Sequence, residues 1–214
     1  PATIRNGTLP TRLLQYGIGP AGASRDRAVA TGDVDGDKLT DVVVTDSEQA
    51  QLLLYRQNGI DGLSMAEIFP SLLGVTDIAT ADLDSDDVLD IVLLSSKEGV
   101  VATSHFEGGR ITFPRTILKE PEGSKLAAVD VLKSVETVQI VVALTTGTGS
   151  SMKLTFQRLV RSETGEWQPA KDHQNIELTG AVGSRGVRFV RMDVNSDGRM
   201  DLLSVPTGTS KTGV

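Results

Sequence analysis

One nine-residue pattern, present three times, constrains the fold of this chain more than any other feature. Each copy places carboxylate or amide side chains at positions 1, 3, 5 and 9, and an apolar run follows at once. The copies span residues 33–41, 82–90 and 193–201. Because like charges this close together repel strongly, a bound cation is the simplest way to hold each group in place.

The residue types and their spacing fit a loop that binds calcium. Calcium takes about six to eight oxygen ligands from carboxylates, backbone carbonyls and water. Alternate positions turn successive carboxylates toward the inside of a curling loop, and position 7 can add its backbone carbonyl oxygen. The predicted metal ligands are Asp33, Asp35, Asp37, Leu39, Asp41, Asp82, Asp84, Asp86, Val88, Asp90, Asp193, Asn195, Asp197, Arg199 and Asp201.

The EF-hand is the rival loop with the same early spacing. It requires a bidentate Glu at position 12 and a helix on each side. Position 12 is Val44, Leu93 or Ser204 in the three copies, and the neighbouring residues are β-branched or aliphatic. The sequence therefore favours an acidic loop between two strands.

The interval between copies points to a repeated β-sheet unit. It is 49 residues from Asp33 to Asp82 and 48 residues from Asp82 to Asp130. Periods of about 40–50 residues with four short strands each are typical of propeller blades. Asp130 begins a degenerate copy that keeps only the first acid, with a loop one residue longer. We expect this blade to fold like the others without binding metal.

An acidic loop that leads into a strand, such as 33–41 followed by Val42-Val43-Val44, resembles the FG-GAP or VCBS repeats of integrin-like and secreted bacterial β-propellers. The resemblance covers nearly the whole chain and implies a calcium loop between the first two strands of a four-stranded blade. Gly is usual at position 6 of these repeats, but only Gly198 conforms here. Where position 6 requires a positive φ, the Asp87 of the second copy is tolerated better than the Lys38 of the first.

We therefore predict an all-β fold: a β-propeller, or part of one, of about four four-stranded blades with Asp-rich calcium loops. Residues 1–214 form a single propeller or a propeller fragment, with repeats at approximately 23–73, 74–121, 122–180 and 181–214. Residues 1–16 are a possible closing strand of the last blade or a strand of a preceding blade. Further blades can come from the same parent chain or from another chain.

The charge of the chain is concentrated in the three loops. They hold twelve of the 28 acidic residues, and the remaining 16 face 21 Lys and Arg. The sequence has no basic stripe interleaved with aromatic residues, so we expect no nucleic-acid partner. No apolar stretch approaches the roughly 18 residues of a membrane span.

The sequence offers little catalytic chemistry. It has no Cys nucleophile, no GxSxG or HExxH motif and only two histidines, neither in metal-ligand spacing. We expect a non-catalytic binding or scaffold module of an exported protein, stabilised by about three structural calcium ions. Its site of action would be extracellular, periplasmic or on the cell surface, with a protein or carbohydrate ligand, as in adhesion. The alternatives are a polysaccharide-active enzyme or its accessory domain, and a lectin-like adhesin in which Trp167 stacks on a sugar.

Overall fold

The computed structural model describes residues 16–19, 27–59, 62–133, 137–147, 152–171, 178–179 and 186–207. Within these ranges the chain forms antiparallel β-sheets and contains no α-helix, which confirms the all-β prediction. The closing strand predicted at 1–16 lies outside the described residues except for Tyr16.

Two four-stranded sheets come first along the chain. Sheet 1 has the order β1 (Val29–Gly32), β2 (Asp41–Asp46), β3 (Gln51–Tyr55) and β4 (Glu67–Pro70). Sheet 2 has the order β5 (Val75–Ala81), β6 (Asp90–Ser95), β7 (Val100–Ser104) and β10 (Arg115–Lys119). A small hairpin of β8 (Phe106–Glu107) and β9 (Arg110–Ile111) precedes β10.

The second half of the chain forms a larger sheet and a hairpin. Sheet 3 has the order β11 (Ser124–Lys133), β12 (Val138–Thr146), β13 (Lys153–Arg161) and β14 (Trp167–Pro169), and β15 (Leu178–Thr179) also pairs with β13. Sheet 4 contains β16 (Val187–Met192) and β17 (Asp201–Pro206).

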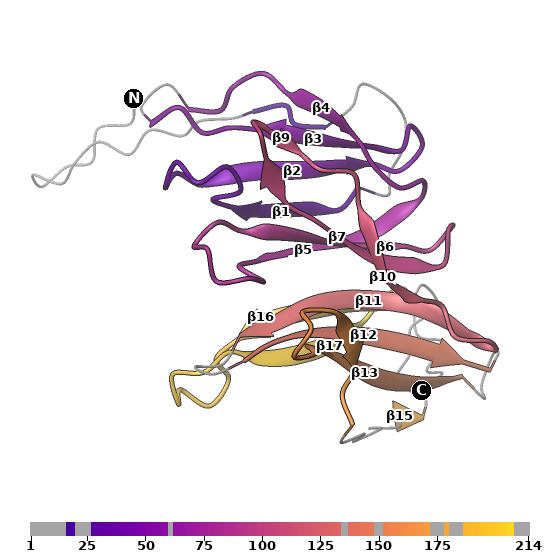
Figure 1. Cartoon of the computed structure of the whole chain (residues 1–214). Helices are drawn as coiled ribbons and strands as arrows, with labels where there is room; N and C mark the ends of the chain where they lie inside the picture. The colour runs from indigo at the N-terminus through magenta and orange to yellow at the C-terminus, as the bar shows by residue number, and fades with distance from the viewer. Residues whose placement is uncertain are drawn as a thin grey trace, which may run out of the picture.

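The sheets stack face to face, as Figure 1 shows from the indigo end of the chain to the yellow end. Alternation along the second strand of each sheet explains this stacking, because successive side chains point to opposite faces. In β6, Ile91 and Leu93 pack toward sheet 1, whereas Val92 and Leu94 pack toward sheet 3. All six residues of β6 are buried. A strand that is covered on both faces in this way requires an almost continuous apolar run.

The first strands of neighbouring sheets lie side by side. A hydrogen bond joins β5 to β1, from Thr80 Oγ1 to the carbonyl oxygen of Thr31 (3.0 Å). The strand β5 is joined to β11 by a bond from Val129 N to Asp77 Oδ2 (2.9 Å). An ion pair between Arg191 and Asp130 (3.2 Å) joins β16 to β11.

The degenerate copy differs from its prediction. The expected loop after Asp130 is wrong, because the β11–β12 ladder continues from Asp130↔Val141 to Lys133↔Val138. Residues 131–133 lack the acids and glycines that would turn the backbone into an acidic loop, and they extend the ladder by pairing with residues 138–140 instead.

Candidate metal centre

Each acidic loop connects the first strand of a sheet to its second strand. We call residues 33–41 loop 1, residues 82–90 loop 2 and residues 193–201 loop 3; they join β1 to β2, β5 to β6 and β16 to β17. All three project from the same side of the stack, on the left in Figure 1. Loops 1 and 2 are in contact, since Leu89 N donates to the carbonyl oxygen of Asp33 (2.8 Å).

The three loops share an unusual backbone conformation. Position 6 has a positive φ in every copy: 69° at Lys38, 67° at Asp87 and 82° at Gly198. This confirms that the glycine usual at position 6 reflects a backbone requirement. Position 4 also has a positive φ in every copy, a requirement that the sequence reasoning missed; Gly36, Ser85 and Ser196 occupy it.

The same hydrogen bonds recur within the loops. The position 5 carboxylate accepts from the backbone N–H of position 7, at 2.7 Å in loop 1, 2.9 Å in loop 2 and 2.8 Å in loop 3. The position 1 carboxylate accepts from the N–H of position 4 in loops 1 and 2, and of position 5 in loop 3. These bonds fix the carboxylates by local turns, which explains why the spacing alone predicts the geometry.

Loops 1 and 2 each bring three carboxylates together. In Asp33, Asp35 and Asp37, one carboxylate oxygen from each residue lies within 4.8 Å of the others, and the same holds for Asp82, Asp84 and Asp86. Two groups of this kind, with a backbone fixed around them, could hold a metal ion. Positions 1, 3 and 5 of the predicted ligand set therefore converge in these loops.

The position 9 aspartates belong to neither group. Asp41 and Asp90 are buried, and the carboxylate of each accepts from the N–H of position 2, at 3.2 Å from Val34 and 2.9 Å from Leu83. Burial raises the pKa of Asp41, and it raises the pKa of Asp90 to about 6. Asp201 accepts the equivalent bond from Val194 in loop 3 (3.0 Å). These side chains tie the two ends of each loop together, while their role as metal ligands stays a prediction, as does that of the position 7 carbonyls.

Two basic side chains from outside the loops contact the carboxylates. Arg56, which follows β3, pairs with Asp35 Oδ2 at 2.6 Å and with Glu67 at 2.7 Å, and its guanidinium lies 4.9 Å from the centre of the Phe106 ring. Lys133 of β11 reaches Asp82 Oδ2 at 3.2 Å. Burial alone would raise the pKa of Asp82, but Lys133 and backbone hydrogen bonds outweigh it and lower that pKa. Neither basic residue was singled out from the sequence, because both are distant along the chain.

Loop 3 departs from the other two in charge and in burial. It holds an amide at Asn195, whose Oδ1 accepts from Asp197 N (3.0 Å) and whose Nδ2 donates to Asp197 Oδ2 (3.1 Å). Its position 2 side chain, Val194, is 58% exposed, whereas Val34 is 1% and Leu83 5% exposed. A neighbouring sheet covers position 2 in loops 1 and 2, whereas no sheet among the described residues covers it in loop 3.

The other residues considered from the sequence are Trp167 and the two histidines. Trp167 packs on the core between sheets 2 and 3, with Arg161 over its ring at 5.5 Å. His105 is exposed, and His173 lies outside the described residues. In the part of the chain that the structure describes, no helix has the length and apolar character needed to cross a membrane.

Comparison with known families identifies the repeat. The family model described as FG-GAP-like repeat matches residues 16–93. This match includes loops 1 and 2 in full, and it confirms over those residues the resemblance inferred from the sequence. Comparisons with curated proteins and with solved structures gave no match.

Proposed function

We propose that this chain is a calcium-stabilised β-propeller segment that acts as a non-catalytic binding or scaffold module of an exported protein. The observation that carries the proposal is the geometry of loops 1 and 2, where three carboxylates lie within 4.8 Å of one another on a fixed backbone. The FG-GAP-like repeat over residues 16–93 suggests a propeller-like binding module and supports the same conclusion.

Calcium is the metal that the donor set favours. The donors are carboxylate oxygens with nearby backbone carbonyls, without His or Cys in the loops, which suits a hard cation. The ion would neutralise the repulsion between positions 1, 3 and 5 and so hold the first strand of each sheet against the second. Loop 3 replaces one carboxylate by Asn195, and we expect it to bind the ion more weakly than the other two.

A propeller arrangement accounts for the stacking of the sheets. Sheets 1, 2 and 3 each contain a path of four antiparallel strands, with the first strand beside the first strand of the next sheet. This is the plan of successive blades around an axis. The proposal assigns the repeats at 23–73, 74–121, 122–180 and 181–214 to four blades, with any further blades supplied by the parent chain or another chain.

A need for calcium at these sites would suit an exported protein. Extracellular calcium modules have dissociation constants of roughly 0.1–1 mM, so a few millimolar calcium would stabilise each site by about 0.6–2 kcal/mol. The ligand would be a protein or a carbohydrate. A polysaccharide-active enzyme and a lectin-like adhesin remain the alternatives, although the partly buried Trp167 favours a packing role over sugar stacking.

The test is metal counting on the native protein together with thermal unfolding in calcium and in excess EDTA. We expect about three calcium ions and a lower melting temperature after chelation. The position 5 variants Asp37→Ala, Asp86→Ala and Asp197→Ala should each lose one ion, because each removes both oxygens of an exposed carboxylate in the predicted ligand set.

A matched control lies in loop 2. Asp87→Asn removes the same charge from the same loop, at a position outside the predicted ligands whose positive φ Asn tolerates. It should retain all of the ions. A protein that carries no calcium and whose unfolding is unchanged by EDTA would contradict the proposal.

A further inference from the structure

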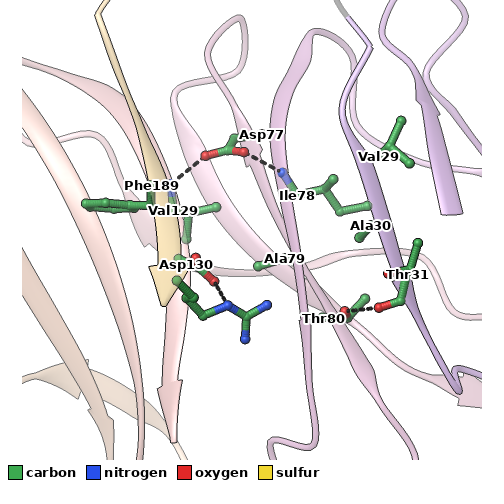
Figure 2. A pocket seen from close by; sticks show the side chains of 11 residues that line it. Val29, Ala30, Thr31, Asp77, Ile78, Ala79, Thr80, Val129, Asp130 and Phe189 are labelled. Atoms are coloured by element: carbon green, nitrogen blue, oxygen red, sulfur yellow. Dashed lines mark hydrogen bonds and ion pairs between the residues drawn. The ribbon is translucent and has the colours of Figure 1, made fainter. Parts of the chain in front are cut away.

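A pocket of about 210 Å³ lies where the first strands of all four sheets meet, apart from the carboxylate groups of the loops. Figure 2 shows its walls: β1 on the right, then β5, β11 and β16. Its polar lining residues are Thr31, Asp77, Thr80, Asp130 and Arg191. Phe189 also lines it, but the ring of Phe189 points away from these groups and packs beside Phe156, with 5.8 Å between the ring centres (Figure 2). At about 30 Å³ per water, the volume corresponds to about seven waters, which suits a small polar molecule.

The polar groups of the pocket are held in place by contacts between sheets. Asp77 accepts from Val129 N at 2.9 Å and from Ile78 N at 3.0 Å, one bond to each carboxylate oxygen. Asp130 Oδ1 accepts from Val131 N at 2.8 Å and pairs with Arg191 Nε at 3.2 Å. The carboxylates are therefore oriented before any ligand arrives, which lowers the entropic cost of binding.

The charges in the pocket do not balance. Arg191 compensates Asp130, but among the described residues no cation contacts Asp77. Burial, with a smaller contribution from the nearby charge of Asp130, raises the pKa of Asp77 to about 6. At neutral pH one largely buried negative charge therefore remains, and a cationic ligand would compensate it.

The guanidinium group of Arg191 limits which kind of cation can bind in the pocket. Arg191 contacts Asp130 through Nε, and in the described part of the chain no partner meets its two terminal nitrogens. A bare metal ion beside this guanidinium would be repelled, whereas a ligand that also carries an oxygen acceptor can receive its N–H groups. The residues of the pocket therefore suit one small molecule that carries both a positively charged hydrogen-bond donor and an oxygen acceptor.

We propose that this pocket binds a small molecule with a primary ammonium group next to oxygen acceptors, of the amino-acid or amino-sugar class. The ammonium group donates to Asp77 and to the second carboxylate oxygen of Asp130. The neighbouring oxygen accepts from the terminal nitrogens of Arg191. The site is distinct from the carboxylate groups of the three loops.

The experiment is ligand-observed NMR with the calcium-loaded protein and two ammonium probes, glucosamine and serine. Glucose and N-acetylglucosamine are the neutral counterparts. Binding of glucosamine assigns the amino-sugar source, and binding of serine assigns the amino-acid source. Either result, without binding of the neutral counterparts, supports the proposal. Equal binding of glucose and glucosamine, or binding of neither ammonium probe, would overturn it.

Variants then locate the bound probe. Asp77→Asn should weaken binding at least about tenfold, since it removes a charged acceptor. Asp46→Asn is the matched control, because Asp46 is also buried (7% exposed) and accepts two backbone N–H groups, at a site that does not line the pocket. It should leave binding unchanged.

A second variant guards against a failure of Asp77→Asn to fold. Thr31 is exposed and lines the pocket, so Thr31→Tyr places a larger side chain there without altering any charge. It should abolish binding. Binding that persists in a folded Asp77→Asn or in Thr31→Tyr would place the probe elsewhere and overturn the proposal.

Discussion

The connection between the first two strands differs sharply between sheet 2 and sheet 3. In sheet 2 the ladder ends at Ala81↔Asp90, and an acidic loop fills the space between. In sheet 3 the ladder continues from Asp130↔Val141 to Lys133↔Val138, so the backbone groups satisfy one another. The acidic loop brings three carboxylates together in a group that could hold a cation, whereas the extended hairpin is stabilised by ordinary sheet hydrogen bonds.

The same comparison shows that a repeat without an acidic loop can contact the acidic loop of the neighbouring sheet. Without the acids, the chain after Asp130 extends β11 and carries Lys133 to Asp82 of loop 2. Asp130 itself faces Arg191 and the pocket. A degenerate repeat thus keeps its place in the stack and acquires contacts between sheets.

The effect expected over the largest number of residues is on hydrogen exchange after calcium removal. Amides of β1, β2, β5 and β6 should exchange about three- to thirtyfold faster in EDTA, which corresponds to about 0.6–2 kcal/mol per site. Amides of β11 and β12 should change least, because we expect no metal to bind at their connection. Equal acceleration of amide exchange in sheets 2 and 3 would contradict the proposed difference between their connections.

The next effect concerns Asp90, which ties loop 2 together. Asp90→Ala leaves the buried N–H of Leu83 without its acceptor and should lower the free energy of unfolding by about 1–3 kcal/mol. The loss should appear in denaturant titrations with and without calcium. Asp86→Asn, by contrast, should lower stability only when calcium is present. If both variants behave alike in EDTA, the division between structural and ligand carboxylates is wrong.

A pH effect is expected at Asp77, which joins sheet 2 to sheet 3. Burial raises its pKa from 3.8 to about 6, so the folded state holds the proton more tightly than the unfolded chain does. The charged groups that face it in the described structure are Asp130 and Arg191. Its contribution to stability is therefore largest below about pH 4 and is lost as the pH rises to about 6. The stability of the wild type relative to Asp77→Asn should fall over that range in urea titrations, and a flat difference would contradict this.

The smallest effect is expected at Lys133. Its side chain is 59% exposed, so the pair with Asp82 contributes at most about 1 kcal/mol to stability. Lys133→Gln should nevertheless strengthen calcium binding at loop 2 a few-fold, because a competing positive charge is removed. Calorimetric titration would show it, and Lys125→Gln, whose partner is Glu120, is the control. Weaker calcium binding in Lys133→Gln would refute the competition.

Much of the fold and of the candidate metal centre follows from short stretches of sequence. The order of acids and glycine in loops 1 to 3 sets the turns, and the β-branched runs after them set the second strands. The requirement for a positive φ at position 6 was predicted from the glycine usual there. These features depend on about ten consecutive residues, so local patterns suffice to reveal them.

The contacts between repeats could not be predicted in this way. Arg56 beside Asp35, Lys133 beside Asp82 and the pocket at Asp77 join residues from 21 to more than 50 positions apart. The position 2 side chains show the same limit, since Val34 and Val194 occupy equivalent places but differ in exposure from 1% to 58%. The sequence by itself determined the three acidic loops and the strands that follow them, because each is built from neighbouring residues. Only the tertiary structure decided which charges meet, since that depends on how the sheets stack.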